Sequence, residues 1–222
     1  MQRPDENIAI IELIIQGVKT TGLSAFCNCD ILFKKEEENI MENQIKRTKR
    51  TLKHAGTIVD FYSDTMQLPD GKLAEWDFVH HRKGAAAVVP VLDDGKILMV
   101  RQFRNALDRI TLEIPAGARD SVEEETRICA ARELEEETGY YSDTLEYLLS
   151  LRPTVAYCDE FIDVYVAKNL VKTQQHLDPD EYVELTSYDI DELCDMIYAG
   201  DIQDGKTIAA LMAYKNKYNN LK

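Results

Sequence analysis

One segment rich in glutamate has the spacing of a helix, while most of the chain around it has the patterns of strands. Apolar residues recur at helical spacing from Ile128 to Thr138, and Ser121 with Glu124 matches a capping box. We therefore expect the helix to open at Ser121. Gly139 stands where a helix-terminating glycine belongs, so the helix should end there.

Three of its glutamates, Glu133, Glu136 and Glu137, occupy positions i, i+3 and i+4, so their carboxylates share one helix face. The like-charge pair Glu133 and Glu137 costs roughly 0.2–0.5 kcal/mol in an isolated helix. A divalent cation would relieve this repulsion, and Mg²⁺ prefers carboxylate oxygens together with substrate phosphates. For a run of glutamates alone, the alternative is a solvated acidic face.

The rest of the pattern alternates irregularly between strands and helices. The segments expected as strands are 57–66, 76–79, 85–92, 96–103, 111–114, 145–150, 162–167 and 181–185. A turn at 69–71 joins the first two as a hairpin, and two further helices are expected over 190–198 and 206–217. This order favours an α+β fold with a mixed sheet over a doubly wound parallel sheet.

The length and the net charge of the chain limit its number of domains and the kinds of partner that it can bind. The chain has 222 residues and a net charge of −14, which predicts one domain with an appendage and argues against nucleic acid or an anionic membrane as a partner. Five cysteines without paired spacing indicate reduced thiols. No apolar run approaches the roughly 18 residues of a membrane span. We therefore predict a cytoplasmic protein with no membrane partner.

Residues 1–40 differ from the rest, with an apolar patch, two cysteines and the charged run 34–38 before Met41. The codons for Lys-Glu-Glu can contain a purine-rich ribosome-binding sequence a short distance before the Met41 codon. Our hypothesis is that residues 1–40 are leader sequence translated from a misplaced start. The alternative is an amphipathic helix over 7–18 that docks on a partner.

The stretch from Arg132 to Tyr140 fits the pattern R-E-U-x-E-E-x-G-U, where U is bulky and apolar or aromatic, and so resembles the signature of the Nudix hydrolases. The family's upstream glutamate matches Glu124. Its glycine would be residue 118, which is Ala118, while Gly117 precedes it. The loop before the helix is therefore one residue longer than the family pattern.

Two flanking segments, 100–104 and 112–117, together with the N-terminal hairpin, resemble the ADP-ribose pyrophosphatase branch of this superfamily. The resemblance implies a Nudix-type α/β/α sandwich with a mixed sheet. It also implies a small antiparallel N-terminal β subdomain, exchanged across a homodimer. The expected division is 1–40 as leader or extension, 41–83 as β subdomain and 84–222 as Nudix hydrolase domain.

The resemblance also implies roles for site residues. Glu133 and Glu137 resemble the principal Mg²⁺ ligands, with Mn²⁺ as a possible substitute, and Glu136 a further ligand or water holder. The carbonyl of Ala116 resembles a backbone metal ligand. Arg132 resembles the arginine that orients these carboxylates by ion pairing, and we group it with Glu136 as catalytic.

The remaining site residues have alternatives. We favour Glu160 as general base, with Glu181 as runner-up. Arg104 is a candidate contact to phosphate or ribose. Glu113 either contacts a ribose hydroxyl or pairs with Arg101, and Trp76 either stacks on adenine or fills a dimer core.

The implied reaction is Mg²⁺-dependent hydrolysis of ADP-ribose to AMP and ribose 5-phosphate. One alternative is another nucleoside diphosphate sugar, a UDP- or GDP-sugar. Another is a sensor that binds ADP-ribose without hydrolysing it. Three crowded carboxylates argue against the sensor, since a pure binder does not need them.

Overall fold

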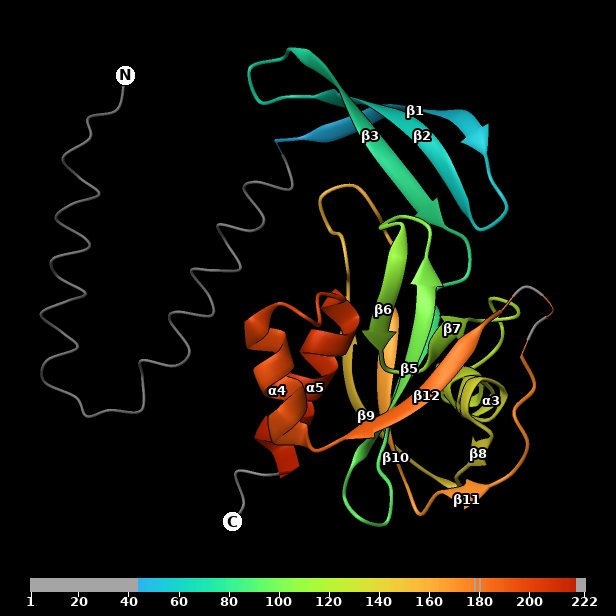
Figure 1. Ribbon diagram of the computed structural model, residues 1–222. Helices are drawn as coiled ribbons and strands as arrows, with labels where there is room; N and C mark the ends of the chain where they lie inside the picture. The colour runs from blue at the N-terminus through green and yellow to red at the C-terminus, as the bar shows by residue number, and fades with distance from the viewer. Residues whose placement is uncertain (1–43, 178, 180, 219–222) are drawn as a thin grey trace, which may run out of the picture. The chain divides into compact units, whose positions relative to one another are not determined.

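The computed structural model describes residues 44–177, 179 and 181–218 (Figure 1). The expectations for residues 1–40 and for a start at Met41 lie outside this part of the chain. Among the described residues, no helix is long and apolar enough to cross a membrane.

The chain divides into two compact units. The described residues of one are 44–50 and 64–76; those of the other are 51–63 and the chain from 77 to 218, without 178 and 180. One sheet has three strands in the order β1-β2-β3, which are β1 (Lys46–Ala55), β2 (Val59–Gln67) and β3 (Leu73–His81). The predicted turn is confirmed: Leu68 N–H donates to the Lys72 carbonyl at 2.8 Å, and Gly71 has a φ of 82°. The division at residue 84 stays a prediction.

The larger unit contains two main sheets and one small pair. Its strands are β4 (Ala85–Pro90), β5 (Ile97–Arg104), β6 (Arg109–Glu113), β7 (Ala116–Ala118), β8 (Tyr140–Tyr141), β9 (Thr144–Leu151), β10 (Ile162–Lys168), β11 (Val171–Lys172) and β12 (Val183–Tyr188). The first sheet has the order β7-β4-β10-β9 and is mixed, because β4 pairs parallel with β10 and antiparallel with β7. The second, β12-β5-β6, is antiparallel, and β11 pairs with β8.

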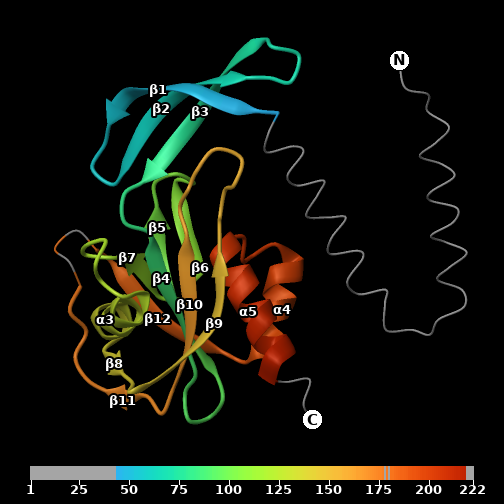
Figure 2. The same cartoon turned by 180° about the vertical axis from the view of Figure 1, so that it is seen from behind.

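Helices cover both sides of these sheets within the larger unit. Helix α3 (Thr126–Thr138) lies on one side, and α4 (Ile190–Ala199) and α5 (Gly205–Tyr218) lie on the other (Figures 1 and 2). Strand β4 is buried along its whole length, as its nearly continuous apolar sequence requires between two helical layers. The predicted α/β/α sandwich with a mixed sheet is confirmed.

Helix α3 begins later than predicted. Its N-cap is Glu125, not Ser121, and no side chain caps it. The Glu124 carboxylate accepts the N–H of Asp120 at 2.7 Å, so the expected reciprocal bond has moved one residue upstream. The helix end is as predicted, because Gly139 has a φ of 66° and its N–H donates to the Glu135 carbonyl.

The inner face of α3 is apolar where it meets β4 and β10. Leu134 is fully buried against Val88 and Ala167, whereas Ile128 on the same helix is 56% exposed. We expect Leu134→Ala to lower the free energy of unfolding by about 2–5 kcal/mol, because it leaves a cavity in the core. The matched control Ile128→Ala should change it by less than about 0.5 kcal/mol. Urea unfolding followed by circular dichroism measures both, and equal losses would contradict this packing.

Candidate active site

Helix α3 buries two of its glutamates against strand β7. Glu133 is 9% exposed and Glu137 is 3% exposed. The N–H of Ala116 donates to Glu137 Oε2 at 3.0 Å. Gly117 leaves room for Glu133, because a Cβ at Gly117 would lie 2.2 Å from the Glu133 carboxyl carbon. The glycine is therefore required by the close approach of this carboxylate.

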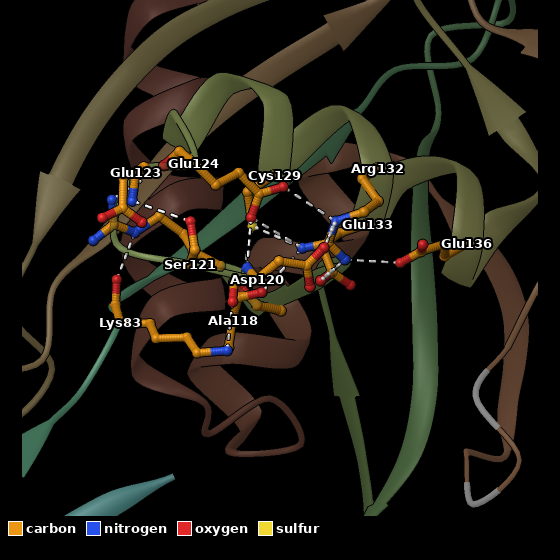
Figure 3. A network of polar contacts seen from close by, with 12 residues as sticks. Lys83, Ala118, Asp120, Ser121, Glu123, Glu124, Cys129, Arg132, Glu133 and Glu136 are labelled. Atoms are coloured by element: carbon orange, nitrogen blue, oxygen red, sulfur yellow. Dashed lines mark hydrogen bonds and ion pairs between the residues drawn. The ribbon is translucent and has the colours of Figure 1, made fainter.

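Arg132 holds the carboxylates of this helix together (Figure 3). Its Nη1 donates to Glu133 Oε1 at 2.7 Å and to Glu136 Oε2 at 2.8 Å. Its Nε donates to Glu124 Oε1 at 3.2 Å, and its Nη2 to the Ala118 carbonyl at 3.0 Å. One guanidinium thus ties three glutamates to the strand beneath, the ion pairing that the sequence resemblance implies for it.

Burial and crowding act on the two buried carboxyls. Burial raises the pKa of Glu133 to about 7, against the lowering effect of Arg132. Burial and the neighbouring Glu133 charge raise the pKa of Glu137 to about 8. The charge of Glu181 contributes to both increases, so this residue acts electrostatically on the pair. Such carboxyls are poised to gain stabilisation from a cation.

These residues suit a divalent cation that is shared with a ligand. No group of three or more His, Cys, Asp or Glu side chains in the described part of the chain forms a ready-made metal cage. The donors are instead two buried carboxylates, Glu133 and Glu137, beside the backbone of Ala116. Mg²⁺ is characteristically bound by one or two carboxylates and substrate phosphates, so this donor set fits it.

A cavity of about 430 Å³ opens beside these carboxylates. The predicted site residues Arg104, Ala116 and Glu160 line it together with Gly117, and so do His81, Asp204 and Lys206, which were not predicted. Ala116 and Gly117 are thus in contact with both the cavity and the buried carboxylates. Trp76 belongs to the smaller unit, where it is 46% exposed, and its role stays a prediction.

Glu113 pairs with Arg104 and Lys206. Arg104 donates through Nε at 2.8 Å and Nη2 at 2.6 Å, and Lys206 Nζ donates to Glu113 Oε2. Burial opposes the charge of Glu113, but these two cations lower its pKa to about 2. The alternative pairing of Glu113 with Arg101 is wrong, because the Glu113 carboxylate bonds Arg104 and Lys206. Arg101 lies near Glu184 instead, with 3.9 Å between Arg101 Nε and Glu184 Oε2.

Glu160, the favoured general base, lies on a loop attached to the end of β3. Asp159 Oδ2 lies 2.7 Å from His80 Nδ1, and Asp159 Oδ1 accepts the N–H of His81 at 2.8 Å. His81 Nε2 lies 3.7 Å from Glu160 Oε1. The loop therefore holds Glu160 at the cavity wall through the neighbouring Asp159.

Sequence reasoning missed four residues around the cavity: His81, Asp159, Asp204 and Lys206. Asp204 had a usable signal in the sequence, because an aspartate just before an expected helix is a preferred N-cap residue. In the structure its Oδ2 accepts the N–H of Thr207 at 3.0 Å, as an N-cap does. Nothing local pointed to Lys206, whose partner Glu113 is 93 positions away.

Residues 81–211 match the NUDIX domain. The matched range includes α3 and the cavity residues Arg104, Ala116, Gly117, Glu160 and Lys206. The chain therefore belongs to the Nudix hydrolase family, as its signature predicted.

Two bacterial relatives match over most of their length. The chain is 38% identical to a methanol dehydrogenase activator of Bacillus methanolicus, covering 79% of this chain and 91% of that protein. It is 35% identical to an ADP-ribose pyrophosphatase of Bacillus subtilis, covering 84% and 94%. The crystal structure of an ADP compounds hydrolase superposes with a TM-score of 0.73 at 18% identity, covering 80% of this chain and 96% of that one, which supports the fold.

The raised pKa values predict how stability depends on pH without divalent cations. Because the pKa values of Glu133 and Glu137 lie above the ordinary value of 4.5, the folded state retains their protons longer than the unfolded state. The free energy of unfolding that the two protonated carboxyls contribute is therefore lost as pH rises from about 4.5 to about 8. Glu137→Gln should reduce the fall in melting temperature between pH 5 and pH 8, measured in EDTA.

Glu135→Gln, on the same helix, is the matched control and should retain the wild-type pH dependence. Adding a divalent cation should stabilise the wild type more at pH 8 than at pH 6, because the ligands must lose their protons to bind it. Identical pH profiles for the wild type and Glu137→Gln would contradict the assignment of a buried, protonated pair.

Proposed function

We propose that this protein is a Mg²⁺-dependent pyrophosphatase that hydrolyses ADP-ribose to AMP and ribose 5-phosphate. The observation that supports it most is the buried pair Glu133 and Glu137, packed on Ala116 and Gly117 at the edge of a cavity that also contains Arg104. Carboxylates on one side and a cation on the other suit a metal-bound diphosphate. The similarity to ADP-ribose pyrophosphatases supports the substrate.

The cation would be held by Glu133 and Glu137, with Glu136 and the carbonyl of Ala116 as further ligands. A bound Mg²⁺ supplies charge neutralisation at phosphate oxygens and a more acidic water. Arg132 is then the residue that keeps the carboxylates in place, through its bonds to Glu133 and Glu136. Mn²⁺ can substitute for Mg²⁺ in such oxygen-rich sites.

The protein's own groups bind the substrate and move a proton. Arg104 is our candidate contact to phosphate or ribose, and Trp76 our candidate for stacking on adenine. Arg104 donates two N–H groups to the Glu113 carboxylate. We therefore assign Glu113 the role of orienting Arg104, in place of the ribose contact considered from the sequence. Hydrolysis adds water across the phosphoanhydride, so the attacking water must lose a proton to a base.

Two glutamates compete for the role of base. Glu160 is our first candidate, because it lines the same cavity as Ala116. Glu181 is the second, because its charge raises the pKa values of Glu133 and Glu137 and it therefore acts on the same site.

A different sugar nucleotide is the second candidate substrate. A GDP-mannose pyrophosphatase of Salmonella is 28% identical over 58% of this chain and 72% of that protein. The homodimer with an exchanged N-terminal subdomain, the cytoplasmic location and the absence of nucleic-acid partners remain proposals from the family resemblance and the net charge of −14.

A hydrolysis panel tests the function. We expect AMP from ADP-ribose in the presence of Mg²⁺, little turnover of UDP-glucose, GDP-mannose or NADH, and none of any substrate in EDTA. Glu137→Gln should lower kcat by at least about 100-fold with the fold retained, since it removes a proposed ligand. Glu135→Gln is the control and should retain activity. A preference for GDP-mannose would mean that the assignment of Arg104 and Trp76 as contacts to ADP-ribose is wrong. Binding of ADP-ribose without turnover would favour the sensor.

The two candidate bases are separated by Glu160→Gln and Glu181→Gln. The loss of a general base typically costs about 10²–10⁴ in rate. We expect this loss in kcat for Glu160→Gln and a smaller one for Glu181→Gln, measured with saturating ADP-ribose and Mg²⁺. The reverse order would assign the base to Glu181. Glu184→Gln, an exposed change on β12, is the control for an altered surface charge.

A further inference from the structure

A buried lysine at the start of α5 belongs to the cavity wall. Lys206 is 9% exposed and lines the cavity together with Arg104. Its Nζ donates to Glu113 Oε2 and, at 2.9 Å, to Asp204 Oδ2. A lysine this buried is rare unless it is paired, so its two anionic partners account for its place in the fold.

Glu113 connects this lysine to Arg104. The carboxylate is 2% exposed and accepts from Arg104 Nε and Nη2 at 2.8 and 2.6 Å and from Thr111 Oγ1 at 2.6 Å, besides Lys206. Because Glu113 Oε2 is bonded by both cations, its rotamer is fixed from two directions. The orientation of the guanidinium therefore depends on a carboxylate that Lys206 helps to hold.

This arrangement also determines which edge of Arg104 is left for a ligand. A guanidinium has five N–H donors in a fixed plane. The Nε and Nη2 edge is committed to Glu113, and the side chain is still 40% exposed. The edge that includes Nη1 therefore remains for an anion in the cavity, and its direction follows from the bidentate pair.

Asp204 fixes the lysine in turn. Its Oδ2 accepts the N–H of Thr207 at 3.0 Å and Thr207 Oγ1 at 2.6 Å, which caps α5. Thr207 Oγ1 also accepts the N–H of Ile114 at 3.1 Å, next to Glu113 in the chain. The start of α5 and the end of β6 are thus joined by hydrogen bonds on both sides of the lysine.

We infer that Lys206 is a positioning residue for diphosphate recognition, which fixes Glu113 so that Arg104 presents its remaining edge to the phosphates. This inference rests on the proposed function for its substrate class. It adds a residue whose effect on the ligand passes through two others.

The test measures binding of ADP without added divalent cation, by isothermal titration calorimetry. Lys206→Met keeps the length of the side chain and removes its charge. We expect about a tenfold weaker affinity for ADP, and with ADP-ribose and Mg²⁺ a larger change in KM than in kcat. Lys206→Arg should recover part of the affinity. Lys215→Met, which removes a lysine of α5 that pairs with exposed Asp191, should bind ADP as the wild type does.

A double-mutant cycle separates positioning from a general structural effect. If Lys206 acts through Arg104, the pair Arg104→Met and Lys206→Met should bind ADP no more weakly than Arg104→Met alone. Additive losses would overturn the inference, as would wild-type affinity in Lys206→Met. If Lys206→Met does not fold, Glu113→Gln combined with Lys206→Met removes both buried charges and should show the same loss of affinity.

The proposed function and this inference fail in different ways. If the wild type binds ADP but does not hydrolyse ADP-ribose with Mg²⁺, the proposed reaction is wrong, and the ADP titrations still report on Lys206. If Glu137→Gln loses turnover and keeps its affinity for ADP, the two sides of the cavity act separately, as we expect. Absence of ADP binding by the wild type overturns the inference.

Discussion

The ion pairs of Arg132 are the interactions on which the site depends. Helix α3 places several acidic groups on one side, and burial of Glu133 and Glu137 against β7 adds a desolvation cost to their repulsion. Arg132 offsets part of this cost by bonding Glu124, Glu133 and Glu136 at once. Its hydrogen bond to the Ala118 carbonyl joins the carboxylates to the strand. The helix is therefore kept in a geometry that its own charges oppose.

Arg132 leaves Glu137 outside this network. The Glu137 carboxylate accepts the Ala116 N–H, but burial outweighs this bond and, with the charge of Glu133, raises the pKa of Glu137 to about 8. A cation bound there would neutralise the carboxylate of this pair that Arg132 does not bond. The crowding that raises the pKa of Glu137 therefore lowers the stability of the fold at high pH, and the same crowding favours a bound cation.

Arg104 and Lys206 bring positive charge to the lining of the cavity. The chain has a net charge of −14, so a diphosphate meets a repulsive surface unless cations are placed locally. Arg104 and Lys206 are two such cations, and Glu113 bonds both while neutralising part of their charge. The buried carboxylate of Glu113 weakens the attraction of the two cations for an anionic ligand, but it fixes the orientation of Arg104. A fixed orientation of polar groups is what allows a site to discriminate among similar ligands.

Features set by neighbouring residues could be predicted from the sequence. The spacing of Glu133, Glu136 and Glu137 fixes their common helix face, and a residue without a Cβ suits the left-handed conformation at Gly139. The start of α3 depended on the loop before it. That loop is one residue longer than the family pattern, and Glu124 bonds Asp120 and Arg132 where a capping box was expected.

Contacts between distant segments could not be predicted in the same way. Lys206 and Glu113 are 93 positions apart, and His80 and Asp159 are 79 apart, so no local spacing relates them. The sequence left two alternatives for Glu113, a contact to a ribose hydroxyl or an ion pair with Arg101. Successive side chains of a strand point to opposite faces of the sheet, so Arg101 and Arg104, three residues apart in β5, lie on opposite faces. Since Arg104 and Glu113 lie on paired strands, β5 and β6, the face of the sheet decides which arginine meets the buried carboxylate.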